Sequence, residues 1–244
     1  MYPVIYSFRY LTMYSYGLMV AFAIGMAAFL LTRQAKKQGF NPELIYNLCF
    51  IAFFSGIIGA RILYIILNFD YYLDNPFEVF MLNRGGLVWF GGFILASLSC
   101  VIYLKHKQLD IYKILDLAIP YVALGQAIGR IGCFLNGCCF GNEVLRGGLY
   151  FPVHHRTLIP VQLYSSLFLL GIYITLRILQ GRTQRKGEIF YFYIFLYSLT
   201  RFFVEFIRGD SGIFILGLSV FQVISIVLFI FSLVMLTRIK GSKA

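Results

Sequence analysis

Charged residues are scarce in this sequence. Aspartate, glutamate, lysine and arginine make up 13% of the 244 residues, whereas 60% are hydrophobic and the mean hydropathy is +0.80. Soluble domains carry about 25% charged residues, so the composition excludes that class and predicts a polytopic membrane protein. The formal net charge of +11 therefore bears on membrane topology, and we expect no nucleic-acid partner.

Paired cysteine motifs and well-placed histidines are also missing. The five cysteines form no CxxC pair, so no disulfide framework can be inferred. The C-x4-C-C spacing of Cys133, Cys138 and Cys139 matches no zinc pattern. The three histidines fall in expected loops, which argues against haem ligation. We therefore expect no metal and interpret the thiols as small packing residues, with a metal site as the weaker alternative.

Seven apolar runs are each long enough to cross the hydrocarbon core of a bilayer as a helix. The sequence thus predicts an all-α fold, a single domain of seven transmembrane helices over residues 1–244. The expected spans are residues 14–32, 44–67, 87–104, 114 into the glycine-rich stretch 125–141, 160–179, 188–207 and 216–236. The polar residues between spans predict an external connection at 68–84 and an extended external loop or short hairpin at about 142–159.

Basic residues are concentrated in alternate loops. The cytoplasmic ends of the first, third, fifth and seventh spans, together with the segments after them, hold 13 of the 21 lysines and arginines, including every lysine. The positive-inside rule assigns these segments to the cytoplasm, so we expect the N-terminus outside and the C-terminus inside. The other basic residues are all arginines, whose planar fork suits bidentate phosphate contact: Arg9, Arg61, Arg84, Arg130, Arg146, Arg156, Arg201 and Arg208.

The stretch GQAIGRIGCFLNGCCFG at 125–141 combines glycines with Arg130 and Asn136. Glycines allow a neighbouring helix or a ligand to approach the main chain closely. We expect Arg130 at or just past the end of the fourth span. An arginine at that depth is costly unless it faces a wet cavity or an anionic partner, which indicates a functional site. The alternative is a small-residue packing motif whose arginine extends to the membrane surface.

The sixth span carries a second arginine cluster in the segment SLTRFFVEFIRGD. Arg201 and Glu205 are spaced i,i+4 and share a helix face, with Arg208 one turn further along it. One interpretation is a self-neutralising ion pair, with Arg208 and Asp210 forming the solvated end of the span. Because Glu205 is one acid among several arginines, we favour a positive cavity open to the outer leaflet, which predicts an anion such as a lipid phosphate.

Six short elements resemble the prolipoprotein diacylglyceryl transferase family, in order along nearly the whole chain. The first four are YGLM at 16–19, GAR at 59–61, the glycine pairs at 85–86 and 91–92, and the signature segment from Gly129 to Gly141. The last two are PVQLY at 160–164 and Arg201 with Glu205. Any one of these elements is weak, whereas six in order on seven spans form a specific pattern.

The chain departs from the family pattern at four positions. The signature commonly reads GRxGNFxNGE, so Cys133 replaces an asparagine and Cys138 a glutamate. Phe90 stands where a histidine or tyrosine usually precedes the second glycine pair, and Ser165 replaces a glutamate after PVQLY. Phenylalanine neither takes nor gives a proton, so the identity of the catalytic base and of the acceptor substrate is left open.

The resemblance implies an enzyme of the bacterial plasma membrane, multi-pass, with its active site toward the outer side. It would move the diacylglyceryl group of phosphatidylglycerol to the thiol of the lipobox cysteine in a preprolipoprotein signal peptide, with no cofactor, and release glycerol phosphate. Arg130 and Arg201 would stabilise the departing phosphate, and Glu205 would orient Arg201 or accept a proton. The residues expected to bind substrate are Tyr16, Arg61, Asn136, Gln162 and Tyr164.

Two other functions stay open at this stage. A catalytically altered relative would bind an anionic lipid or a lipoprotein without transfer, as the substitutions at Phe90, Cys133 and Cys138 could cause. A transporter of small anions would use the same positive cavity. No half of the chain duplicates the other, which argues against the transporter folds built from repeats.

Overall fold

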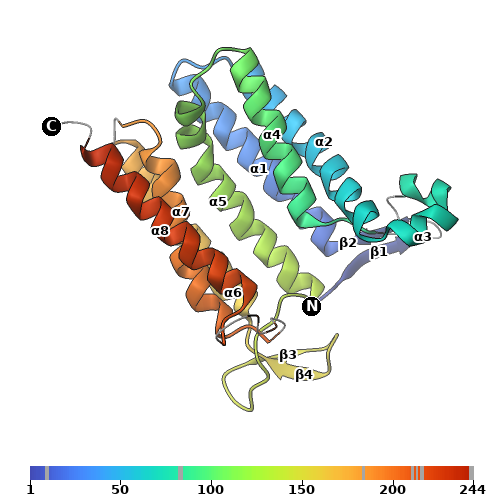
Figure 1. Ribbon diagram of the computed structural model, residues 1–244. Coiled ribbons are helices and arrows are strands. Elements are labelled where there is room, and N and C mark those ends of the chain that lie inside the picture. Colours follow the sequence, from blue (N-terminus) through green and yellow to red (C-terminus); the bar gives the residue numbers. More distant parts are fainter. Residues whose placement is uncertain are drawn as a thin grey trace. The chain divides into compact units, whose positions relative to one another are not determined.

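A computed structural model describes residues 1–8, 11–81, 85–182, 185–209, 212, 214 and 217–241. The expectations for Arg9, Arg84, Asp210 and the first residue of the seventh span, Leu216, lie outside these residues. Most of the described chain is helical (Figure 1), and six helices are long and apolar enough to cross a membrane: α1 (Ser15–Lys37), α2 (Pro42–Leu67), α4 (Trp89–His106), α5 (Ile111–Asn136), α6 (Val161–Gln180) and α8 (Val220–Gly241). The prediction of a polytopic, helical membrane protein is therefore confirmed.

The expected sixth span forms helix α7 (Glu188–Glu205), which is not among these six. It is as long as α4, but its 18 residues include the charged side chains of Glu188, Arg201 and Glu205. A helix surrounded by lipid on all sides would not carry these three charged side chains, because burying each charge in hydrocarbon costs free energy. The count of seven spans and the orientation of the termini stay predictions.

The described chain forms two compact units, residues 32–114 and residues 1–31 with 115–244, which we describe separately. In the first unit, α2 and α4 lie side by side (Figure 1). A Cβ on Gly59 would lie 2.4 Å from the carbonyl oxygen of Gly91, so only glycine allows this approach. The connection predicted at 68–84 contains a short helix α3 (Phe69–Asp74) and the 3-10 helix η1 (Pro76–Phe80).

In the larger unit, α7 packs against both α6 and α8 (Figure 1). Its apolar core joins α5, α6 and α7 through Ile119, Ala123, Ile172, Leu176, Ile189 and Tyr193. The carboxylate of Asp116 in α5 accepts hydrogen bonds from the backbone N–H of Gly187 (2.5 Å) and of Phe190 (2.8 Å). This carboxylate satisfies N–H groups at the start of α7 that have no helical partner, and thereby anchors α7 to α5.

Two β-hairpins complete the larger unit. The hairpin of β3 (Leu149–Phe151) and β4 (Arg156–Leu158) confirms the short hairpin expected within 142–159. The hairpin of β1 (Val4–Phe8) and β2 (Leu11–Tyr14) was not predicted, and its second strand occupies the start of the expected first span. Helix α1 therefore begins at Ser15.

Helix α5 corrects the predicted position of Arg130. The helix continues through three glycines to Asn136, so Arg130 lies inside it rather than at or past its end. Gly132 belongs to the contact with α1, since a Cβ there would lie 2.9 Å from Cβ of Met19. Gly132 thus serves close helix packing, and none of the three glycines ends the helix.

Candidate functional site

A buried ion pair occupies the C-terminal end of α7. The Nη2 atom of Arg201 lies 2.9 Å from Oε2 of Glu205, and the Glu205 side chain is 1% exposed. The hydroxyl of Ser219 donates a hydrogen bond of 3.0 Å to the other carboxylate oxygen, Oε1. The guanidinium of Arg201 also lies over the ring of Phe221, with its Cζ 4.7 Å from the centroid, a cation–π contact. The ion pair with Glu205, four residues along the same helix face, and the contact with Phe221 thus hold Arg201 in one orientation.

Arg208 approaches the same carboxylate from outside the helix. Its Nε lies 3.8 Å from Oε2 of Glu205, although α7 has already ended at Glu205. The segment after α7 pairs with the segment after α5, through a bridge between Arg208 and Gly141 and a hydrogen bond from the N–H of Asn142 to the carbonyl of Ile207 (3.0 Å). One carboxylate therefore faces two guanidinium groups.

Arg130 and Arg201 line one cavity. Its volume is about 20 Å³, and its other lining residues are Ser165, Leu169, Tyr197, Thr200 and Val204. Within the described part of the chain, no hydrogen bond or ion pair engages Arg130, which is half-buried. A cavity of this volume holds about one water molecule, so a phosphate group would enter only with movement of the Arg130 side chain, which no contact within the described chain holds.

Gln162 supplies a second unsatisfied polar group. Its side chain is fully buried, and its Nε2 donates a hydrogen bond of 2.6 Å to the carbonyl of Cys138. The amide oxygen, Oε1, has no hydrogen-bond donor among the described residues. A buried acceptor without a donor is costly, so this atom is suited to a donor from a ligand or a water molecule.

The other predicted substrate residues of this unit lie at helix ends. Tyr16 is in the first turn of α1 and Tyr164 in the first turn of α6, and they are 44% and 40% exposed. Asn136 is the last residue of α5. A Cβ on Gly132 would lie 3.5 Å from the ring of Tyr16, which places this tyrosine beside the signature segment.

Arg61 belongs to the smaller unit, where it has a different environment. It is buried, and its five N–H groups all donate to backbone carbonyls: Nε to Val79, Nη1 to Gly85 and Gly86, and Nη2 to Glu78 and Met81. Its guanidinium also lies over the rings of Tyr64 and Tyr72. With every donor engaged, Arg61 has none left for a phosphate, and its geometry is that of a residue that holds the backbone at 78–81 and 85–86.

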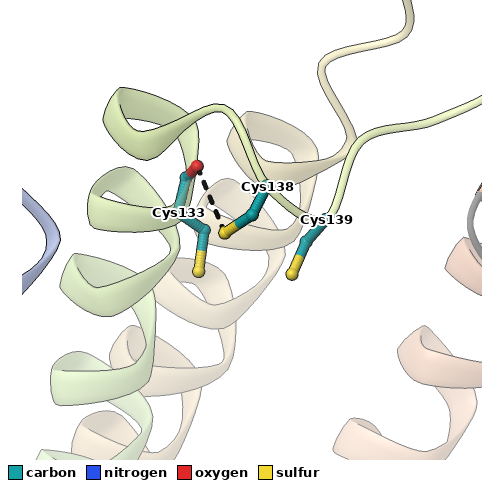
Figure 2. A group of neighbouring side chains, drawn as sticks. All are labelled: Cys133, Cys138 and Cys139. Atoms are coloured by element: carbon teal, nitrogen blue, oxygen red, sulfur yellow. Dashed lines mark hydrogen bonds between the residues drawn. The ribbon is translucent and has the colours of Figure 1, made fainter. Parts of the chain in front are cut away.

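The end of α5 brings the three cysteines of the signature together. Gly137 has a φ of +78°, the N–H of Cys138 donates to the carbonyl of Cys133 (3.1 Å), and the N–H of Gly137 donates to that of Phe134 (3.2 Å). These two bonds define a Schellman motif, which requires a left-handed residue and places Cys138 against Cys133. The three Sγ atoms lie within 4.8 Å of one another (Figure 2).

Cys139 lies beyond the helix, and its thiol is electrostatically distinct. Hydrogen bonding with the thiols of Cys133 and Cys138 lowers the pKa of Cys139 below its usual range, against the opposing effect of burial. The positive charges of Arg130 and Arg208 lower the pKa of Cys139 further. The thiol group and the two arginines therefore belong to one electrostatic environment.

Sequence reasoning missed several residues of the site. Ser219 and Phe221 contact the Arg201–Glu205 pair from the start of α8, and no sequence spacing relates them to it. Thr200 lines the arginine cavity and, at one residue from Arg201, could have been noticed. Ser165, identified only as a departure from the family pattern, lines the same cavity. Phe90, another departure, lies in α4 of the smaller unit and is 46% exposed.

Comparison with known proteins gives a consistent result. The prolipoprotein diacylglyceryl transferase family matches residues 3–238. A phosphatidylglycerol–prolipoprotein diacylglyceryl transferase of Clostridium tetani is 36% identical over 230 residues, 92% of each chain. The second such transferase of Clostridium perfringens is 32% identical over 241 residues, 96% of this chain and 94% of the relative. That of Bacillus cytotoxicus is 35% identical over 247 residues, 95% and 90% of the two chains.

Proposed function

Because the chain belongs to the prolipoprotein diacylglyceryl transferase family, we propose that it is a transferase acting on phosphatidylglycerol and a preprolipoprotein. It moves the diacylglyceryl group of the lipid to the thiol of the lipobox cysteine in the signal peptide and releases glycerol phosphate. The reaction forms a C–S bond at the glycerol carbon and breaks the C–O bond to the phosphate.

The observation that carries this proposal is the state of Arg130. It is a half-buried guanidinium inside an apolar helix, it shares a cavity with Arg201, and within the described chain no hydrogen bond or ion pair engages it. A cation in that position is costly unless an anion neutralises it, and a lipid phosphate is the anion that a membrane supplies. Among the described residues, the carboxylate of Glu205 already faces Arg201 and Arg208.

The arrangement supports catalysis by electrostatic stabilisation. Negative charge builds on the phosphate oxygens as the C–O bond breaks, and donors fixed before the reaction stabilise that charge without reorganisation. Arg201 is fixed by Glu205 and Phe221, which makes Glu205 a positioning residue in this proposal. The guanidinium groups of Arg130 and Arg201 together bind the departing phosphate in this proposal.

Gln162, Asn136, Tyr16 and Tyr164 are proposed to bind the substrates around this centre. The buried Oε1 of Gln162 would accept a hydrogen bond from a hydroxyl group, such as those of the glycerol head group. The exposed rings of Tyr16 and Tyr164 suit the level of the lipid head groups, where amphipathic rings are enriched. Arg61 is proposed to position the segment 78–86 instead of contacting lipid.

We propose seven spans, with α7 as the sixth, an external N-terminus and a cytoplasmic C-terminus. The segregation of every lysine to alternate loops supports this orientation. It places the loop 142–159 and the site beside it toward the outer side of the plasma membrane.

A transfer assay tests the function. Purified protein in lipid nanodiscs is mixed with phosphatidylglycerol and a lipobox peptide, and the thioether product is detected by mass spectrometry. We expect a diacylglyceryl adduct on the cysteine peptide and none on a matched peptide with serine at that position. Saturable lipid binding without any adduct would instead establish the binding-only function.

A further inference from the structure

We propose that Cys133, Cys138 and Cys139 form a three-thiolate Zn²⁺ site whose fourth position takes an external thiol. The metal site stands on the geometry of the three cysteines alone. Its occupation by the acceptor cysteine rests on the proposed function, because only that function brings a peptide thiol to this end of α5.

The distances fit a zinc ion with small adjustments. The three Sγ atoms lie within 4.8 Å of one another, and Figure 2 shows Cys133 and Cys138 side by side with Cys139 facing them. Zinc binds thiolate sulfur at about 2.3 Å in tetrahedral geometry, which separates two sulfur ligands by about 3.8 Å. Closure by about 1 Å is within reach of side-chain rotation.

The backbone around the thiols is already fixed. The Schellman motif sets Cys138 against Cys133, and a thiol hydrogen bond from Cys138 Sγ to the carbonyl of Cys133 (3.7 Å) joins the same two residues (Figure 2). The carbonyl of Cys138 accepts from Gln162 (2.6 Å), and that of Gly137 lies 2.7 Å from Nε2 of His154. Metal sites depend on such supporting hydrogen bonds to hold their ligands in place.

Cys139, like Gln108 and His155, has a left-handed backbone conformation. Its φ is +60°, a left-handed conformation that non-glycine residues rarely adopt and that costs of order 1–3 kcal/mol. A helix end of this kind needs one left-handed residue, which Gly137 already provides. Figure 2 shows the Cys139 thiol on the side of Cys138 that lies away from Cys133.

The charges around the site favour a thiolate complex. Three thiolates and one Zn²⁺ carry a net charge of −1, which is costly at a membrane surface unless a cation is near. Arg130 and Arg208 supply positive charge at Cys139. Thiolates are also the ligands that select zinc and other soft ions over magnesium or calcium.

Three protein ligands leave one position of a tetrahedral ion open, as in catalytic zinc sites. The acceptor thiol would displace water at this position and lose its proton to solvent. Metal coordination keeps the thiol as a thiolate at neutral pH, and the thiolate is the nucleophile. Its sulfur attacks the glycerol carbon, and the electron pair of the broken C–O bond leaves with the phosphate, so no oxidant or reductant is needed.

Metal analysis tests the site without reference to activity. The full-length protein is reduced, stripped with a chelator in nanodiscs, reloaded with Zn²⁺ and assayed for metal by mass spectrometry. We expect one Zn²⁺ per chain. Replacement of any one of the three cysteines by serine should weaken Zn²⁺ binding by about a hundredfold or more. Loss of a residue that only hydrogen-bonds to a metal ligand typically weakens binding by about ten- to hundredfold, so loss of a ligand should have the larger effect. The matched control is Cys100→Ser, because that thiol lies in α4 of the other unit.

Wild-type protein gives a second measurement that does not depend on the folding of variants. Bound Zn²⁺ should protect Cys133, Cys138 and Cys139 from alkylation and leave Cys49 and Cys100 as reactive as in the stripped protein. Equal alkylation of the three thiols with and without Zn²⁺, or equal Zn²⁺ retention by the Cys139→Ser and Cys100→Ser variants, overturns the site.

Cobalt substitution tests the fourth position. The Co²⁺-loaded protein should show thiolate-to-metal absorption, and a lipobox cysteine peptide should shift its visible spectrum whereas the serine peptide should not. A spectrum unchanged by the cysteine peptide, or full transfer by metal-free protein, overturns the role in thiol binding. A shifted spectrum without any transfer would leave the zinc site standing and refute the transferase function instead.

Discussion

Replacement of Arg130 by lysine is the most direct test of the arginine cavity. The substitution keeps the positive charge but exchanges a planar fork of donors for a compact ammonium. Because no hydrogen bond or ion pair engages Arg130 within the described chain, the folded protein loses no polar contact. We therefore expect the thermal stability of the variant to remain close to that of the wild type.

The expected effect falls on the chemical step. Loss of one fixed donor to a developing oxyanion typically lowers kcat by about 10²–10³, or about 2.7–4 kcal/mol of transition-state stabilisation. The cavity beside Arg130 has a volume of about 20 Å³, so a shorter lysine leaves room for roughly one more water and not for a second donor group. We predict a decrease in kcat of about a hundredfold.

Initial rates of thioether formation, measured at saturating phosphatidylglycerol and lipobox peptide, provide the measurement. The matched control is Arg146→Lys, in the exposed loop before β3, which should retain wild-type kcat. A raised KM with unchanged kcat would show that Arg130 binds the ground state and the transition state equally. Near-normal kcat and KM would refute the assignment of phosphate to this cavity.

Three further predictions concern the Glu205 ion pair, the hydrogen bonds of Arg61 and the membrane side of two loops. Glu205→Gln should lower the free energy of unfolding by about 3–5 kcal/mol, because a buried ion pair loses one partner. The folded fraction should still show measurable transfer. Complete loss of transfer in a stable variant would instead make Glu205 a proton acceptor. Arg61→Lys should lower the free energy of unfolding by about 2 kcal/mol or more, while kcat per folded molecule stays within about threefold, and a selective loss of kcat would contradict its positioning role. A reporter at Leu145 should be accessible from outside intact cells and one at Arg182 only after the membrane is opened; the reverse pattern would overturn the orientation.

Most of the helices could be predicted because the membrane imposes a minimum length on each apolar run. The observed α2 ends at Leu67 as expected, and the observed α4 begins two residues after the expected start. Helix ends were less accurate where the sequence carried conflicting signals. Gly125, Gly129 and Gly132 indicated the end of α5, but the helix continues through them, and Gly132 allows the close approach of α1.

The N-terminal hairpin was missed because the apolar residues of its strands were assigned to a span or left unassigned. Residues 4–8, VIYSF, and 11–14, LTMY, are rich in aromatic and β-branched residues, the composition typical of strands. Their signal is local and could have been recognised. The position of Ser15, whose N–H donates to the carbonyl of Pro3 (2.9 Å), depends on the hairpin as a whole and could not.

The site was predictable where its geometry is local. The Arg201–Glu205 pair follows from i,i+4 spacing, and the structure contains it. The contribution of Ser219 depends on how α8 begins against α7, and the approach of Arg208 depends on pairing between two distant segments. Arg61 shows the opposite case. An arginine inside a span predicted a bound ligand, but backbone carbonyls between α2 and α4 accept hydrogen bonds from every N–H group of its side chain.

The cysteine group shows that cysteines whose spacing matches no metal motif can still lie close together in the structure. A C-x4-C pattern at the end of a helix, with glycine before the second cysteine, places the two cysteines at the paired positions of a Schellman motif, where the N–H of Cys138 meets the carbonyl of Cys133. That contact is a consequence of helix termination, whereas motif rules for zinc describe turns between strands or the faces of helices. Gly137 is needed for the pattern, because its φ of +78° is one that a residue with a side chain adopts only with strain. Cys139 then adopts a second left-handed conformation that glycine does not relieve, at a cost on the order of 1–3 kcal/mol, and its thiol lies within 4.8 Å of the other two.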